Sequence, residues 1–143
     1  MTVARILAEK GREVTTTQPH RARRGVIELL AAKGIGAVVV ADASMAVLGI
    51  LSERDVVRVL AQSGAAALNE PVSRYMTAKV TTVTSSETID RVMETMTEGR
   101  FRHMPVVEDG RLIGIVSIGD VVKRHVSQLD TERQALREYI ATA

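Results

Sequence analysis

The chain has 143 residues, a net charge of +2, 45% hydrophobic residues, 2% aromatic residues and no cysteine. This length suits one compact domain or two small halves that share a core, and the apolar content argues against disorder. The absence of cysteine excludes disulfides, thiolate metal sites and a cysteine nucleophile. Apolar runs are too short to span a membrane, and Met1–Arg5 does not resemble a signal peptide, so we expect a cytoplasmic protein.

The first half of the chain predicts alternating helices and strands. β-Branched residues favour the first strand, and Gly34 is a good helix terminator. The two later strands are continuous apolar runs, which are typical of strands buried on both faces. The expected helices are Val3–Ala8, Arg21–Lys33 and Ser52–Ala61, and the expected strands are Val14–Thr17, Ala37–Val40 and Val47–Leu51. Arg21, Arg23 and Arg24 are interpreted as a solvent-exposed face rather than a phosphate site.

The second half predicts the same order. Asp109-Gly110 is a strong signal for a hairpin between its last two strands. The expected helices are Pro71–Met76, Glu87–Glu98 and one that begins at Ser117, and the expected strands are Val80–Thr84, Pro105–Val107 and Leu112–Val116. A further amphipathic helix over Leu129–Ile140 is expected to turn Leu136 and Ile140 inward.

The chain is an internal repeat. Gly49–Val57 returns as Gly114–Val122, with Gly, Ile, Ser, Asp, Val and Val at the same spacing. The chain therefore contains two copies of one strand–helix–strand–strand–helix unit of roughly 65 residues. The fold must accordingly be built from two equivalent units. The expected domains are residues 3–63 and 70–127, followed by a helical extension over residues 128–143.

The repeated element places a Ser at the end of a strand and an Asp three residues later, on the first turn of a helix. A helix N-terminus suits phosphate, the hydroxyl adds a hydrogen bond, and an ionised Asp can accept two hydrogen bonds from a ribose. The same pattern is also a capping box, with Ser52 or Ser117 as the cap and Asp55 or Asp120 at the third helical position. Taken singly, either copy is better read as a cap, and the duplication favours a nucleotide clamp.

These residues, with Arg102-His103-Met104-Pro105-Val106-Val107 before the second copy, resemble the CBS-domain pair, or Bateman module. The resemblance covers about residues 3 to 127, and the free-standing form with a C-terminal helix is similar to small bacterial CBS proteins that bind AMP and sometimes NAD. It implies an α/β fold of tandem β-α-β-β-α repeats related by a pseudo-twofold axis, with two ligand clefts between them.

The resemblance also implies which residues form the clefts. Ribose would be bound by Asp55 and Asp120, and phosphate by Ser52, Arg54, Ser117, Arg102 and His103. The adenine pockets would comprise Thr15, Thr16, Thr17, Ile35, Gly36 and Ala37 opposite Asp120, and Val80, Thr81, Thr82, Phe101 and Met104 opposite Asp55. Because Arg102 and His103 correspond to Gly36 and Ala37, the two clefts are expected to be unequal.

We therefore expect a regulatory protein that binds AMP, with NAD(H), ADP or ATP as further ligands, and that acts on an unidentified partner. The resemblance and the apolar helices predict a homodimer; the residues invoked are Val56, Val57, Leu60, Val92, Met96, Val121 and Val122. A ligand-independent interaction module and a nucleic-acid-binding protein are the alternatives, although the small net charge and the scarcity of aromatics disfavour nucleic acid. No catalytic residues and no metal site are expected, because the three histidines are scattered.

Overall fold

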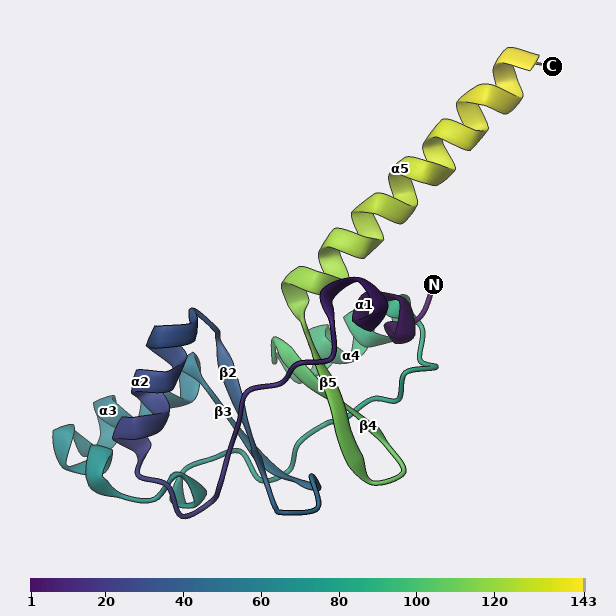
Figure 1. The fold of residues 1–143 in the computed structure, drawn as a ribbon. Coiled ribbons are helices and arrows are strands. Elements are labelled where there is room, and N and C mark those ends of the chain that lie inside the picture. Colours follow the sequence, from purple (N-terminus) through teal and green to yellow (C-terminus); the bar gives the residue numbers. More distant parts are fainter. Residues whose placement is uncertain (143) are drawn as a thin grey trace.

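The computed structural model describes residues 1–142 and has the expected α/β architecture, with two small sheets, each covered by helices (Figure 1). The helices are α1 (Val3–Lys10), α2 (Arg23–Lys33), α3 (Glu53–Ser63), α4 (Ile89–Gly99) and α5 (Ile118–Thr142), with short 3-10 turns η1 (Ala65–Asn69) and η2 (Val72–Arg74). The strands are β1 (Thr16–Thr17), β2 (Ala37–Ala41), β3 (Val47–Ser52), β4 (His103–Glu108) and β5 (Arg111–Ser117).

The two copies form similar sheets, one of three strands and one of two. In the first copy β1 runs parallel to β2, and β2 pairs antiparallel with β3 in the order β1-β2-β3. In the second copy β4 and β5 form the expected hairpin. The predicted strand Val80–Thr84 is wrong in extent, because this segment contributes only one parallel bridge, from Val83 to Val106. β2 is buried throughout, whereas β3 alternates and is not buried on both faces.

Each copy has its own apolar core, and each core is completed by a segment from outside its repeat. Helix α1 packs into the core of the second copy, through Val3, Ile6 and Leu7. The start of the second copy packs into the core of the first copy, through Val72 and Met76. The two halves are therefore interlocked, which fixes how they face each other.

The duplicated glycines explain this interlocking. A Cβ at Gly114 would lie 2.7 Å from Cδ2 of Leu7, and a Cβ at Gly49 would overlap the sulfur of Met76. Real Cβ atoms do not approach other atoms so closely, so only glycine lets these side chains lie against the sheet. In both copies a packed side chain uses the room that the glycine leaves.

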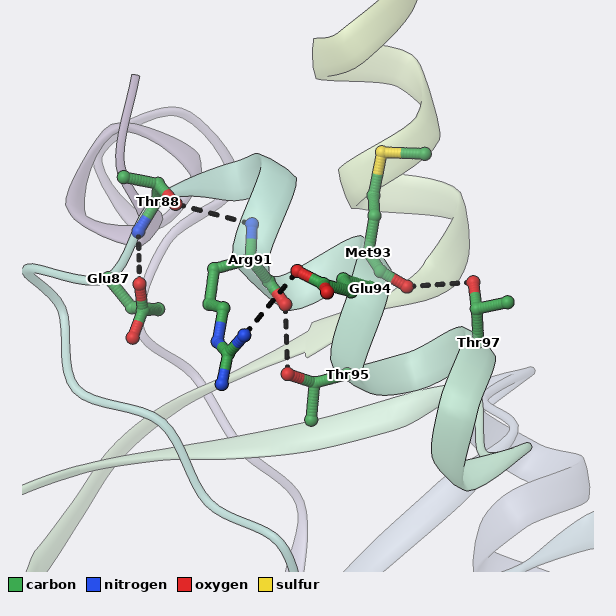
Figure 2. A network of polar contacts seen from close by, with 7 residues as sticks. All are labelled: Glu87, Thr88, Arg91, Met93, Glu94, Thr95 and Thr97. Atoms are coloured by element: carbon green, nitrogen blue, oxygen red, sulfur yellow. Dashed lines mark hydrogen bonds and ion pairs between the residues drawn. The ribbon is translucent and has the colours of Figure 1, made fainter.

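Helix α4 begins two residues later than predicted because of its capping. The Thr88 hydroxyl accepts a hydrogen bond from the Arg91 N–H at 3.2 Å, and the Thr88 N–H donates to Oε1 of Glu87 at 2.9 Å (Figure 2). Thr88 is thus the N-cap, a position that threonine fills well. Further along the exposed face, Thr95 and Thr97 donate to the carbonyls of Arg91 and Met93 (Figure 2).

The arginines before α2 do not form the uniform solvated face that was predicted. Arg23 is 0% exposed, whereas Arg21 and Arg24 are exposed. Arg23 Nη1 donates to the carbonyl of Ala67 at 2.5 Å, and its guanidinium carbon lies 4.0 Å from the ring centroid of Tyr75. The prediction failed because a long-range carbonyl and an aromatic ring offset the cost of burying this charge.

The C-terminal part of the chain is one continuous helix rather than two. Helix α5 leaves the second copy and projects away from the rest of the molecule (Figure 1). Leu136 and Ile140 are 59% and 66% exposed, so the prediction that they turn inward is wrong. Val92, Met96 and Val121 are buried within the chain and are not available to a dimer interface.

Candidate functional site

A cleft of about 500 Å³ lies between the two copies and draws its walls from both. Such a volume suits a small organic ligand. The first copy supplies the start of α3 and Gly36, and the second supplies residues near 80 and the turn between α4 and β4. The lining residues are Gly36, Ile50, Ser52, Glu53, Arg54, Asp55, Arg58, Thr77, Lys79, Val80, Thr81, Gly99, Arg100, Phe101, Arg102 and His103.

The strand end and helix start at Ser52 form a complete capping box. Asp55 N–H donates to Oγ of Ser52 at 3.3 Å, and Oδ2 of Asp55 accepts from the N–H and the hydroxyl of Ser52 at 2.9 and 3.0 Å. This reciprocal pair satisfies donors that the first turn of α3 would otherwise leave open. The capping interpretation of Ser-x-x-Asp is therefore confirmed in the first copy.

Capping uses only one of the two oxygens of the Asp55 carboxylate. Both cap bonds go to Oδ2, while Oδ1 lies 3.7 Å from Nη1 of Arg58, beyond normal hydrogen-bond distance. A carboxylate has about four acceptor sites, so Oδ1 retains capacity for hydroxyl donors. The residue is 8% exposed and lines the cleft, so its carboxylate is held rigidly at the wall by the cap.

Cations surround the same cleft. Arg54 and Arg58 come from the first turns of α3, and Lys79, Arg100 and Arg102 come from the second copy. Arg100 has a left-handed backbone, with φ of 57°, because it ends α4 where glycine is commoner. Negatively charged groups of a ligand, such as phosphate, would be attracted to this rim. The acidic side chains in the cleft lining are Glu53 and Asp55.

His103 occupies a position shared by two clefts. It lines the larger cleft and a second one of about 340 Å³. A Cβ at Gly36 would lie 3.0 Å from Cε1 of His103, so the missing side chain in the first copy provides room for the imidazole of the second. Burial lowers the pKa of His103, and the Lys10 charge lowers it further, so the neutral ring is favoured.

The second cleft has a different character. Its lining residues are Lys10, Glu13, Val14, Thr15, Gly34, Ile35, Gly36, Ala37, His103, Ile115 and Ser117. The Asp120 N–H donates to Oγ of Ser117 at 3.2 Å, and Oδ2 of Asp120 accepts from the Ser117 N–H at 2.9 Å. The same oxygen lies 2.6 Å from Nζ of Lys10, a basic residue of α1. Asp120 is thus already paired with a cation from within the chain.

The pairing affects the ionisation of Asp120. Burial raises the pKa of this carboxyl, but hydrogen bonds from Lys10 and from the Ser117 N–H outweigh burial and hold the pKa below its usual value. Asp120 is therefore ionised at neutral pH. The described residues, 1–142, contain no group of three or more metal-ligating side chains and no helix with the length and apolar character of a membrane span.

Comparison with known proteins agrees with the repeat and the fold. The family model named CBS domain matches residues 12–62 and 72–127. The chain belongs to the CBS-domain family. The CBS pair is similar to the crystal structure of a CBS-domain protein from Agrobacterium tumefaciens, with 50% sequence identity, a TM-score of 0.84 and coverage of 87% of this chain and 99% of that chain.

Two further relatives share the CBS domains. A CBS-domain protein from Pyrobaculum aerophilum, solved in complex with AMP, is 25% identical, with a TM-score of 0.74 and coverage of 84% of this chain and 89% of that chain. The mitochondrial CBS domain-containing protein CBSX3 of Arabidopsis thaliana is 40% identical over 110 residues, which are 74% of this chain and 53% of the relative. This CBS pair therefore spans about half the length of the plant relative.

Most predicted cleft residues of the CBS pair come together in space, but several do not. Ser52, Arg54, Asp55, Arg102 and His103 share the larger cleft. Of the predicted adenine-pocket residues, Val80, Thr81 and Phe101 line this cleft, whereas Thr82 lies outside it and Met104 packs in the core of the second copy. Met104 belongs to the core because the alternation along β4 turns it away from the cleft.

Only some of the residues predicted for the second cleft line it. Thr15, Ile35, Gly36, Ala37 and Ser117 line it. Thr16 and Thr17 instead pair with β2, and Asp120 is bound to Lys10 outside the cleft lining. Charged cleft residues that were not predicted from the sequence include Lys10, Glu53, Arg58, Lys79 and Arg100. For Arg58 the helical spacing from Asp55 was a usable signal, whereas Lys10, Lys79 and Arg100 lie outside the motif and reach the clefts only through the fold.

Proposed function

We propose that this CBS pair is a regulatory protein that binds an adenine nucleotide in the larger cleft, with AMP as the expected ligand and NAD(H), ADP and ATP as alternatives. The observation that carries the proposal is the composition of that cleft. A carboxylate with a spare oxygen lies at a helix start, and a rim of cations surrounds the same space. A nucleotide has both complements, ribose hydroxyls for the carboxylate and phosphate for the cations.

The base would lie near Val80, Thr81 and Phe101. These residues lie outside the regular elements of the second copy, where backbone groups can read the edge of a base while apolar side chains cover its faces. Adenine and guanine have opposite donor and acceptor patterns at N1 and C6. A site that pairs with adenine leaves buried groups unpaired against guanine, so AMP should bind more tightly than GMP.

The second cleft would bind differently. Its smaller volume and the Lys10–Asp120 pair leave less carboxylate capacity for ribose. Lys10 and the neutral His103 lie in its wall, so a ligand there would meet one strong cation rather than a rim. We therefore propose that the clefts have different affinities, and that Asp55 dominates nucleotide binding.

Regulation follows from the position of the larger cleft. A ligand that contacts both copies would stabilise one arrangement of the two halves, and it could shift an equilibrium only by its difference in affinity for the two states. The regulated partner would bind preferentially to that arrangement of the two halves.

Calorimetric titration of AMP into the protein and into Asp55→Asn tests the proposal. The amide keeps a cap acceptor for the Ser52 N–H but removes the charge that ribose hydroxyls would meet, so affinity should fall by at least about tenfold, as expected for a charge-assisted bond. The melting temperature should change little. Asp130→Asn, an exposed aspartate on α5, is the matched control.

Two results would contradict the proposal. Binding of AMP by Asp55→Asn at the wild-type affinity would reduce Asp55 to a helix cap. Failure of the wild-type protein to bind AMP, ADP, ATP or NAD(H) would favour the ligand-independent interaction module.

A further inference from the structure

Helix α5 carries an unpartnered apolar seam along the part that projects from the CBS pair (Figure 1). The seam is defined by Val122, Val126, Leu129, Leu136 and Ile140, which are 42% to 66% exposed. From Leu129 onward every described residue of the helix is exposed, so no other part of the chain covers this surface. Large apolar side chains gathered on one face of a solvent-exposed helix indicate a contact surface.

The spacing of the seam is that of a coiled coil. Its positions, including Arg133, follow each other at alternating steps of four and three residues from Val122 to Ile140. This is the heptad pattern in which two helices pack their a and d side chains together. Val126, Arg133 and Ile140 take the a positions, and Val122, Leu129 and Leu136 take the d positions. β-Branched residues at a, here Val126 and Ile140, with Leu at d favour two strands, and the single polar a residue, Arg133, specifies register at a cost in stability.

Flanking charges select the partner and the orientation. In a parallel, in-register pair of α5 helices, Glu132 at a g position faces Arg137 at the following e position of the second helix, and the pair occurs twice by symmetry. The antiparallel pairing that buries the whole seam would instead place Glu132 against Glu132, Asp130 against Asp130 and Lys123 against Arg137. Glu132 and Arg137 form no ion pair within residues 1–142, so both are available across an interface.

We propose that a second copy of this chain covers the seam, and that the two α5 helices form a short, parallel, in-register coiled coil. Helix α5 has 25 residues and is therefore roughly 38 Å long at the usual rise per residue, so the projecting part is long enough for the seam to pair. The bodies of the two CBS pairs would lie side by side at the same end of the coil. This self-association does not depend on nucleotide binding.

The first test is the mass of the full chain by analytical ultracentrifugation at tens of micromolar. The wild-type protein should sediment at twice its 15.5 kDa mass, and the double variant Leu129→Glu/Leu136→Glu should be monomeric. Both leucines are exposed in the single chain, so the variant should keep its fold and its AMP affinity. Ser127→Glu/Gln134→Glu, on the outer face of the same helix, is the matched control and should remain dimeric.

The second test separates the orientations. Arg137→Glu should weaken a parallel dimer, because Glu132 then faces a like charge, whereas it would strengthen the full-seam antiparallel pair, in which position 137 faces Lys123. Glu132→Lys/Arg137→Glu should restore the parallel dimer. Because the chain has no cysteine, Leu129→Cys should form a disulfide-linked dimer on oxidation, and Ser127→Cys should not.

A monomeric wild-type chain, or a dimer that survives Leu129→Glu/Leu136→Glu, would overturn the proposal. A dimer that is strengthened by Arg137→Glu, or in which Leu129→Cys is not cross-linked, would overturn the parallel arrangement.

Discussion

Nζ of Lys10 lies 2.6 Å from Oδ2 of Asp120, although the two residues are 110 positions apart in the sequence. The pair joins α1 to the start of α5 and lies beside the second cleft. It makes the two copies chemically unequal, because the equivalent carboxylate of the first copy, Asp55, is bonded only within its own helix start and lies near Arg58.

Removing the Lys10 charge should lower stability in a pH-dependent way. The side chains of Lys10 and Asp120 are 33% and 25% exposed, so Lys10→Met should cost on the order of 1 kcal/mol of unfolding free energy at pH 7. The folded pKa of Asp120 is below its unfolded value, so the stabilisation is present above the unfolded pKa and disappears as the pH falls through the folded pKa. Urea unfolding of both proteins at several pH values measures this.

The control for this prediction is Lys33→Met, which changes an exposed lysine at the end of α2. Its effect on stability should be smaller. A Lys10→Met deficit that stays constant down to pH 2 would contradict the ionic explanation.

Arg100→Gly should weaken AMP binding without lowering the stability of the protein. Arg100 has a left-handed φ of 57°, which glycine adopts freely, so the variant should be at least as stable as the wild type. It removes one cation of the rim, and AMP affinity should fall by about fivefold, equivalent to roughly 1 kcal/mol for a partly exposed charge contact. Asp109→Gly relieves a similar φ of 50° outside the larger cleft and should leave AMP affinity unchanged. Equal AMP affinity in all three proteins would remove Arg100 from the phosphate site.

Gly36→Ala should displace His103. The added Cβ would lie 3.0 Å from Cε1 of the imidazole, so the half-buried ring must shift by a few tenths of an ångström away from Gly36. Because burial is the main cause that lowers the pKa of His103, its pKa should rise toward the ordinary value, which NMR titration of the ring measures. The affinity for AMP should change at the same time, because His103 lines the larger cleft. In the control, Gly25→Ala, the added Cβ meets nothing within 4 Å, and His103 should titrate as in the wild type.

Arg23→Met should be the most destabilising of these changes. It removes the bond to the Ala67 carbonyl and the contact with Tyr75, and it leaves Glu70, whose Oε2 lies 3.9 Å from the guanidinium, without that partner. We expect a loss on the order of 2–4 kcal/mol in unfolding free energy, measured by urea denaturation. Arg24→Met, at the adjacent exposed position, should change stability by less than about 0.5 kcal/mol. Similar losses in both variants would show that Arg23 is not a buried anchor.

Sequence alone was enough to predict the repeat, the family, the hairpin at Asp109-Gly110 and the capping geometry at Ser52 and Ser117. The hairpin and the caps depend on residues a few positions apart, whereas the repeat and the family show in one short motif that returns roughly 65 residues later. The larger cleft was also predictable in outline. Its motif residues lie on one helix start, and the resemblance supplied the rest.

The side chains that fill the remaining space could be identified only in the folded molecule. Folding placed Leu7 over Gly114 and Met76 over Gly49, buried Arg23 beneath Tyr75, paired Lys10 with Asp120 and left the α5 seam exposed. An amphipathic pattern predicts a face but not what covers it, so Leu136 and Ile140 were wrongly expected to turn inward. Partners far apart in sequence are chosen by the packing of the whole chain, and local propensity does not encode that choice.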